Sequence, residues 1–209
     1  LTEGIYGLLG PNGAGKSTIM NIMTGNLPAT KGKITLDGEE ILSMGIAYRK
    51  RMGYMPQQQV FYPGFTAEQF LFYIASLRKM KKSYATNRID MLLKRLELSA
   101  VRHNQIRSFS GGMKQRLLLA QAMLDDPDIL ILDEPTAAMD METTLLAEKL
   151  IASYVQETGC ALILVTHSIQ QARRIADEVL YFHKGKLLEK GLQEQVLNDP
   201  SKDETKRFL

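Results

Sequence analysis

Nine consecutive residues near the start of the chain have the composition of a phosphate-binding loop. They match the pattern G-x-x-x-x-G-K-[ST] and are Gly10, Pro11, Asn12, Gly13, Ala14, Gly15, Lys16, Ser17 and Thr18. Glycines let the backbone turn its N–H groups toward phosphate oxygens, and a helix N-terminus adds positive potential. We expect Lys16 to reach the β- and γ-phosphates of a nucleotide and the Ser17 hydroxyl to bind Mg²⁺. The alternative is a glycine-rich turn with a surface lysine.

A second motif places two carboxylates at the end of an apolar run. Ile129 to Leu132 read as a buried strand, and Asp133 and Glu134 follow directly. Burying acids is costly unless a cation or a proton transfer needs them. Beside a phosphate loop, Asp133 would bind Mg²⁺ directly or through water, and Glu134 would polarise an attacking water. The two motifs together predict a nucleotide hydrolase.

A third motif is a possible second anion site. Ser110, Gly111 and Gly112 stand directly before a helical stretch from Met113 to Leu124. A hydroxyl and two glycines at a helix start can bind an anion, although they can equally form an ordinary capped turn. One nucleotide does not need two such sites from the same subunit.

The elements that must position these residues alternate between strand and helix. Ile5 to Leu9, Ile129 to Leu132 and Ala161 to Val165 are short apolar runs that predict strands buried on both faces. Lys16 to Met23 carries an apolar helical stripe that Gly25 can end. This order predicts an α/β fold, a phosphate-loop NTPase core with a mainly parallel sheet.

The remaining patterns add hairpins and an insertion to that core. Small antiparallel hairpins are expected at 31–38 and 179–189. Helical periodicity replaces the strand pattern between about 66 and 124. We therefore expect a single domain of 1–209, with an α/β core (1–65 and 125–192), a helical subdomain (about 66–124) and a C-terminal tail (193–209).

Composition narrows the function classes. The 26 basic and 23 acidic side chains give a net charge of +3, which offers no argument for nucleic-acid binding. Cys160 is the single cysteine, so no disulfide can form within the chain, and its apolar surroundings indicate core packing. The sequence has no apolar stretch long enough to span a bilayer and no signal-peptide pattern. Any role at a membrane would therefore depend on a partner.

Taken in order, the motifs resemble the ATP-binding cassette (ABC) domains that power transporters, over essentially the whole chain. Gly10 to Thr18 matches the family's phosphate loop, and Ile129 to Glu134 its Mg²⁺-binding strand with the catalytic glutamate. Phe109 to Met113 stands at the signature sequence. Three single residues also match: Gln57 in the glutamine loop, Asp140 in the loop that crosses between subunits, and His167 as the switch histidine.

The resemblance implies an ATPase that works with ATP and Mg²⁺ as a head-to-tail dimer. Each ATP would lie between the phosphate loop of one subunit and Ser110, Gly111 and Gly112 of the other. Gln57 would sense Mg²⁺ and the attacking water, and His167 would hold the water and Glu134 in place. The implied partners are a transmembrane transporter subunit and a second ABC ATPase subunit, identical or different, on the cytoplasmic face of the cell membrane.

The match has departures and leaves alternatives open. Phe109 replaces the usual leucine of the signature and Met113 the usual glutamine. The family has two strands and an adenine-stacking aromatic residue before the loop, for which Leu1 lies too close to Gly10, so either the natural beginning is missing or adenine is held differently. The first half of the chain resembles subunits that drive exporters, whereas Thr166 to Leu209 resembles subunits of importers. This mixture leaves the direction of transport open, and a recombined or engineered chain is a further alternative.

Two other functions compete with the transport ATPase: a non-transport cassette ATPase, of the DNA-repair or ribosome-associated type, and a regulatory nucleotide-binding module. An exposed apolar rim after Gln57, formed by Phe61, Tyr62, Pro63 and Phe65, would favour docking to a membrane subunit, whereas buried aromatics there would be ordinary core.

Overall fold

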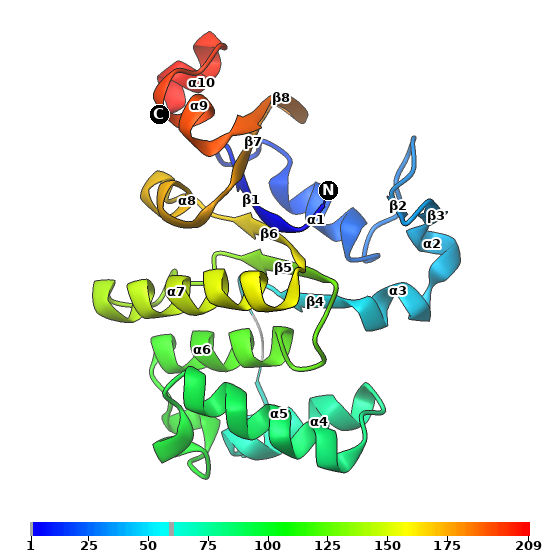
Figure 1. The fold of residues 1–209 in the computed structure, drawn as a ribbon, viewed down its shortest axis with the longest axis vertical. Helices are drawn as coiled ribbons and strands as arrows, with labels where there is room; N and C mark the ends of the chain where they lie inside the picture. Colours follow the sequence, from blue (N-terminus) through cyan, green and yellow to red (C-terminus); the bar gives the residue numbers. More distant parts are fainter. Residues whose placement is uncertain (1, 59–60) are drawn as a thin grey trace.

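A six-stranded sheet with helices on both faces forms the centre of the computed structural model, which describes residues 2–58 and 61–209 (Figure 1). The strand order is β4-β5-β6-β1-β7-β8, and every neighbouring pair except β7 and β8 is parallel. The predicted α/β class with a mainly parallel sheet is confirmed. The strands are β1 (Gly4–Leu9), β4 (Met52–Met55), β5 (Ile129–Asp133), β6 (Ala161–Val165), β7 (Glu178–His183) and β8 (Lys186–Leu192).

The central strands are buried on both faces because apolar residues occupy successive positions along them. On β5, Leu130 and Leu132 pack into the cluster that contains α6 (Gly111–Ala122) and α7 (Met141–Thr158). Ile131 points the other way and packs with Met20 of α1 (Lys16–Met23). Neighbouring side chains of a strand face opposite sides, so an unbroken apolar run is what a two-faced core requires.

The first helix ends and the first hairpin turns where the sequence predicts. Gly25 follows α1 with φ +74°, a left-handed conformation that glycine adopts without strain. Asp37 and Gly38, both with positive φ, join β2 (Thr35–Leu36) to β3 (Glu39–Glu40). This hairpin lies on a lobe that projects from the body together with α2 (Ile41–Met44) and α3 (Ile46–Arg51) (Figure 1).

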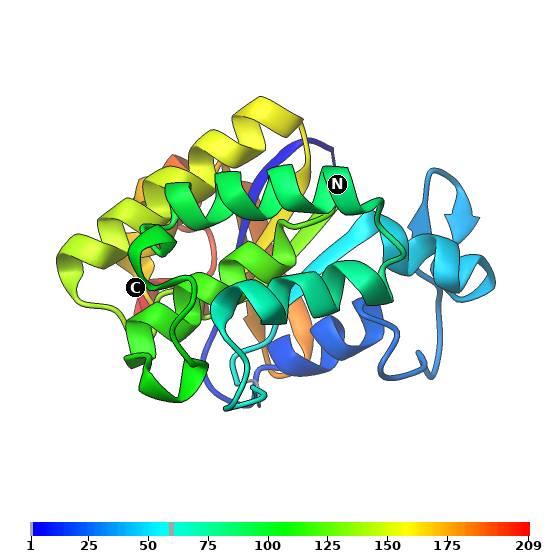
Figure 2. The same ribbon diagram turned by 90° about the horizontal axis from the view of Figure 1, so that it is seen from below.

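The segment between β4 and β5 is helical, as its periodicity predicts. It contains α4 (Ala67–Leu77), α5 (Lys82–Arg95), α6 and two short 3-10 turns, Ser99–Val101 and Ile106–Ser108. Figure 2, seen from below, shows α4, α5 and α6 side by side in front of the sheet. The sixth helix begins two residues before Met113 because Ser110 already caps it, and it ends two residues before Leu124. Its C-terminal end packs on β4 at Gly53, where a Cβ atom would lie 2.1 Å from the Ala122 carbonyl oxygen.

The C-terminal part packs on the far edge of the sheet. The hairpin of β7 and β8 is present as predicted, and α8 (Ile169–Ile175), α9 (Gln193–Asn198) and α10 (Asp203–Phe208) lie beside it. Val196 and Phe208 join a small core with Tyr181. None of the helices in the described ranges is long and apolar enough to cross a bilayer.

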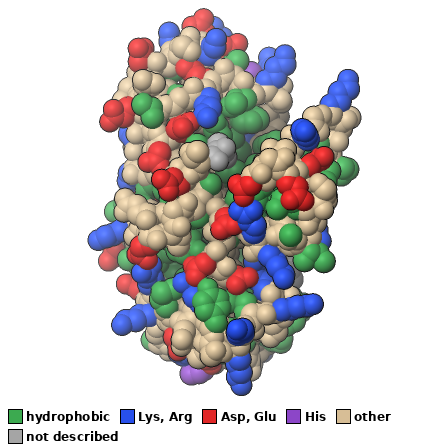
Figure 3. Space-filling model, turned by 45° about the vertical axis from the view of Figure 1, so that its right-hand side comes forward, with side chains coloured by type: hydrophobic (Ala, Val, Ile, Leu, Met, Phe, Trp, Pro, Cys, Tyr) green, Lys and Arg blue, Asp and Glu red, His purple; other side chains and the backbone are tan. Residues whose placement is uncertain are grey.

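A hollow separates the projecting lobe from the body, and apolar side chains line its walls (Figure 3). Ile19, Tyr48 and Ile163 are among the residues that line a cavity of about 450 Å³ there. None of the predicted phosphate-binding residues borders this cavity. The predicted phosphate-binding residues therefore lie in a different part of the molecule.

Candidate functional site

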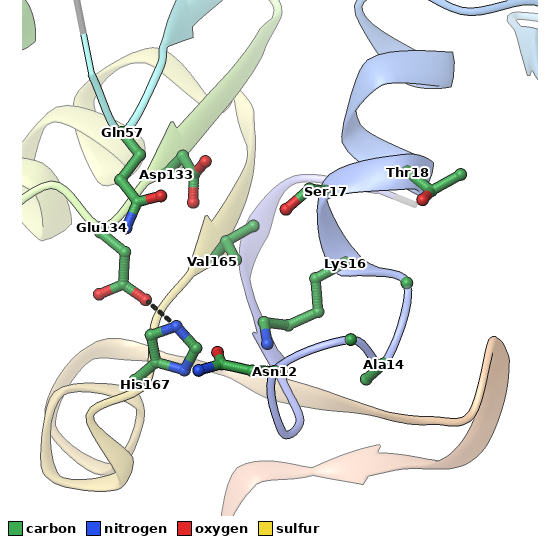
Figure 4. Close-up of a pocket in the computed structure, with 12 residues that line it drawn as sticks. Asn12, Ala14, Lys16, Ser17, Thr18, Gln57, Asp133, Glu134, Val165 and His167 are labelled. Atoms are coloured by element: carbon green, nitrogen blue, oxygen red, sulfur yellow. Dashed lines mark ion pairs between the residues drawn. The ribbon is translucent and has the colours of Figure 1, made fainter.

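Four strand ends meet at one edge of the sheet and carry most of the predicted site residues. In the parallel register, Met55 lies opposite Leu132, and Val165 lies between Asp133 and Leu8. The chain after each of these strands therefore enters the same region. The cleft there has a volume of about 350 Å³ (Figure 4) and is lined by Asn12, Gly13, Ala14, Gly15, Lys16, Ser17, Thr18, Gln57, Asp133, Glu134, Val165 and His167.

The loop between β1 and α1 needs glycine where the backbone passes close to its neighbour. Gly10 has φ +149°, and a Cβ atom there would lie 2.2 Å from the Phe182 carbonyl oxygen. Gly15 has φ +99° and immediately precedes the first helical residue, Lys16. Gly10 and Pro11 begin the loop but do not line the cleft itself. The result is a tight turn that ends at a helix N-terminus, which is a favourable place for phosphate.

Lys16 closes this loop from inside. Its Nζ donates to the carbonyl oxygens of Gly10, at 2.6 Å, and Pro11, at 3.1 Å. The side chain is buried, which lowers its pKa, while the nearby Glu134 and Asp133 carboxylates oppose that shift. The three N–H groups of the Lys16 ammonium can also donate to phosphate oxygens, because an ammonium group rotates freely and has no fixed plane.

Asp133 provides the carboxylate of a possible cation site. Burial raises its pKa, and a hydrogen bond from the Gln57 backbone N–H opposes the shift. The side chains of Ser17 and Gln57 line the same cleft (Figure 4). A carboxylate, a hydroxyl and an amide oxygen are hard donors that suit Mg²⁺. No cluster of three or more His, Cys, Asp or Glu side chains that could hold a metal ion occurs within 2–58 and 61–209.

Glu134 and His167 form a pair across the cleft. Glu134 Oε1 lies 3.4 Å from His167 Nε2, and the glutamate side chain is 12% exposed against 49% for the histidine. The backbone of Glu134 has φ +50° and its N–H donates to the Val165 carbonyl oxygen at 2.9 Å. Burial raises the pKa of Glu134, and His167 opposes the shift. A carboxylate with a raised pKa is a stronger base, which suits proton abstraction from water.

The other predicted residues lie outside the cleft. Ser110 caps α6 by accepting a hydrogen bond from the Met113 N–H at 3.2 Å, and Asp140 caps α7 by accepting one from the Thr143 N–H at 2.9 Å. Neither residue is among the described residues that line the cleft, nor are Gly111 and Gly112. The start of α6 instead packs on the loop before α7, where a Cβ atom at Gly111 would lie 3.2 Å from Ala138 Cβ.

One residue that touches the site was not predicted from the sequence. Gln115 is buried on α6, and its Nε2 lies 3.4 Å from the carbonyl oxygen of Glu134. It links the helix capped by Ser110 to the backbone of the cleft glutamate. The sequence contained one indication that Gln115 is buried: it is a polar residue shortly before an apolar stretch, Leu117 to Ala120, whose side chains are all buried.

Comparison with known proteins decides the family. The family model described as ABC transporter matches residues 2–137. This chain belongs to the ABC transporter ATP-binding family. Members of this family bind ATP.

Individual members of the ABC family resemble this chain along nearly all of it. The methionine import ATP-binding protein MetN of Caulobacter vibrioides is 32% identical over 98% of the chain, which spans 63% of that relative's length. The structure of CbiO1 from Clostridium perfringens, part of the ABC transporter complex CbiONQ, has a TM-score of 0.83 and 27% identity over 95% of this chain and 80% of its own. A dimeric ATP-binding cassette with bound ADP and phosphate has a TM-score of 0.83 and 25% identity over 92% of this chain and 87% of its own.

Proposed function

We propose that this chain is the ATP-hydrolysing part of an ABC transporter, in which MgATP-driven dimerisation is coupled to transport by a separate membrane subunit. The observation that carries the proposal is the cleft itself. Lys16, Asp133, Glu134 and His167 lie at or after the ends of three parallel strands, β1, β5 and β6, and line one cleft of about 350 Å³. Each of these groups has a separate task in phosphoryl transfer to water.

Each residue of the cleft has a different role in ATP hydrolysis. The loop N–H groups and Lys16 bind the phosphates of ATP. Ser17, Asp133 and Gln57 would hold Mg²⁺, which when bound neutralises charge on the β- and γ-phosphate oxygens. Glu134 orients the attacking water and takes its proton, while His167 contacts the γ-phosphate and keeps the glutamate in place. Catalysis then depends on positioning and charge stabilisation, with no covalent intermediate.

The signature residues are proposed to act on the ATP of a second subunit. Ser110, Gly111 and Gly112 begin a helix of 12 residues whose N-terminus lies outside the cleft of its own chain. The N-terminus of a helix attracts an anion. Asp140 lies on the adjacent loop, where it can cross between subunits. The structural relative that is a dimer with bound ADP and phosphate supports dimer formation by this chain.

A group of aromatic rings is the proposed contact with the membrane subunit. Phe61 and Phe65 pack against the core, whereas Tyr62 is 50% exposed and stacks on Phe65 at a centroid distance of 5.1 Å. Tyr73 completes the group 5.4 Å from Tyr62. Of the four residues of the expected rim, Tyr62 and Pro63 are therefore exposed, whereas Phe61 and Phe65 pack beneath them against the core. Exposed apolar surface of this kind is typical of a docking site. Such a contact would hold the subunit on the cytoplasmic face of the membrane.

Mixing two inactive variants tests the shared site. Lys16→Ala removes a phosphate ligand from the loop. Ser110→Asp keeps a good cap for α6 but sets a negative charge against the partner's phosphates. We expect neither full-length variant to hydrolyse ATP alone, and a mixture to recover part of the activity, because one site of each mixed dimer is intact. Absence of recovery would contradict the shared site, and a wild-type protein without ATPase activity would contradict the function.

A further inference from the structure

Four polar side chains form a connected group behind the cleft, which we call the Gln171 tether: Thr136, Glu148, Gln171 and Arg174. The Glu148 carboxylate on α7 accepts two hydrogen bonds from Arg174, from Nε at 2.6 Å and from Nη2 at 2.7 Å. Gln171 Nε2 donates to Glu148 Oε1 at 3.2 Å and to Thr136 Oγ1 at 2.9 Å. Glu148 is 2% exposed and Gln171 is 1% exposed. None of the four lines the cleft.

The chemistry of these groups permits only one orientation of the Gln171 amide. A carboxylate accepts hydrogen bonds and cannot donate them, so the amide must turn its nitrogen toward Glu148. Both Nε2 protons are then used, one on Glu148 and the other on Thr136. Gln171 Oε1 is left without a hydrogen-bond partner among the described residues. A buried oxygen left unpaired is costly, so the nitrogen contacts must outweigh it.

The tether joins the two segments that carry the cleft pair. Gln171 lies on the first turn of α8, four residues after His167, and its backbone N–H donates to the capping Ser168 Oγ at 3.1 Å. Thr136 follows Glu134 by two residues. The bond from Gln171 to Thr136 therefore connects the histidine segment to the glutamate segment, in addition to the 3.4 Å contact between Glu134 and His167.

We propose that Gln171 is a positioning residue for the hydrolysis step, which it serves by fixing the His167 segment to the Glu134 segment through Thr136. The inference rests on the proposed function. The backbone bond from Glu134 to Val165 fixes the strand ends, and His167 lies beyond them with its side chain half exposed. The tether adds a side-chain connection between the two segments, because Gln171 bonds to Thr136 and to Glu148, which also pairs with Arg174 and so joins α8 to α7. A displacement of about 1 Å at a reacting group can reduce the rate about a hundredfold.

A pair of matched substitutions at Thr136 tests the tether in the full-length protein. Thr136→Val keeps the shape and removes the oxygen that accepts from Gln171, whereas Thr136→Ser keeps that oxygen. We expect Thr136→Val and Gln171→Leu to lower kcat by about tenfold to a hundredfold with the KM for ATP unchanged, because binding residues are untouched. Thr136→Ser should hydrolyse ATP as the wild type does. Thermal unfolding, measured alongside, identifies any variant whose loss of activity comes from unfolding.

A double substitution tests the contact between Gln171 and Glu148 by rescue. Gln171→Glu alone sets two carboxylates side by side and should lower kcat. Adding Glu148→Gln restores one donor and one acceptor at the contact, so kcat should recover in part. The proposal is overturned if Thr136→Val and Gln171→Leu keep the wild-type kcat, or if they raise KM and leave kcat unchanged. A wild-type protein that binds ATP without hydrolysing it overturns the proposed function instead, and the tether's role with it.

Discussion

The carboxylate of Glu134 and the imidazole of His167 approach each other to 3.4 Å although they follow different strands. The register explains the approach, because Asp133 lies directly opposite Val165 and the two chains leave the sheet side by side. The left-handed backbone of Glu134, at φ +50°, completes the geometry. A non-glycine residue in that region carries a backbone cost, and such costs concentrate at functional sites.

Glu134→Gln should separate ATP binding from ATP hydrolysis. The amide keeps the size and the hydrogen-bonding oxygen of the side chain but cannot take a proton from water. We expect kcat to fall by about 10²-fold or more, as for loss of a general base, while ATP binding persists. Size-exclusion chromatography with ATP should then show a persistent dimer.

The matched control for this substitution is Glu39→Gln, which makes the same chemical change at an exposed glutamate of the projecting lobe. It should hydrolyse ATP at the wild-type rate. Normal turnover in Glu134→Gln would refute the role of this carboxylate as the base.

The pH profile of kcat should fall on its acid side at a pH above the usual pKa range of a glutamate. Burial raises the pKa of Glu134, and the charge of a protonated His167 opposes that rise. Since a base works in its ionised form, kcat should fall as the pH decreases through this raised pKa. His167→Gln removes the opposing charge, so the acid limb of the residual activity should move to higher pH. A pH profile of kcat for both proteins measures the shift, and coincident limbs would contradict it.

Lys16→Met should weaken nucleotide binding itself. The methionine side chain fills the same space without the ammonium group, and a hydrogen bond to a charged group is worth about 1.5–3 kcal/mol. Titration calorimetry should therefore show an ATP affinity lower by roughly ten- to a hundredfold. Lys33→Met, at an exposed position of the lobe, should bind ATP normally. Equal affinities in the two variants would exclude Lys16 from phosphate binding.

Asp133→Asn should stabilise the nucleotide-free fold. Burial raises the pKa of Asp133 in the folded state, so the folded protein holds this proton to higher pH than the unfolded chain does. The free energy of unfolding therefore decreases as the pH rises through the two pKa values. Removing the charge should raise the free energy of unfolding at neutral pH by on the order of 1 kcal/mol. Substitutions at functional sites commonly stabilise a protein in this way, because function and stability make different demands on the same residue.

Urea unfolding without Mg²⁺ measures the effect of Asp133→Asn. The gain over wild type should shrink as the pH is lowered, because a protonated aspartate is also neutral. A gain that is independent of pH, or a loss, would show that burial of the charge is not its cause.

The sequence by itself determined the local elements and predicts the chemistry of the phosphate loop. The helix at Lys16–Met23, the strands around Ile129 and Ala161 and both hairpins follow from apolar periodicity and from turn residues such as Gly25 and Gly38, which act over a few neighbouring positions. The pattern at 10–18 likewise predicts its ligand class, because the contacts expected of a phosphate loop come from one short segment.

Only the tertiary structure decided which distant residues meet. The strand order β4-β5-β6-β1 brings Gln57, Asp133 and His167 to one edge, and no local pattern encodes that order. Gln115 and Gln171 look like unremarkable helix residues in the sequence. They acquire partners through the packing of α6, α7 and α8, where a buried amide must find hydrogen bonds from whatever element lies beside it.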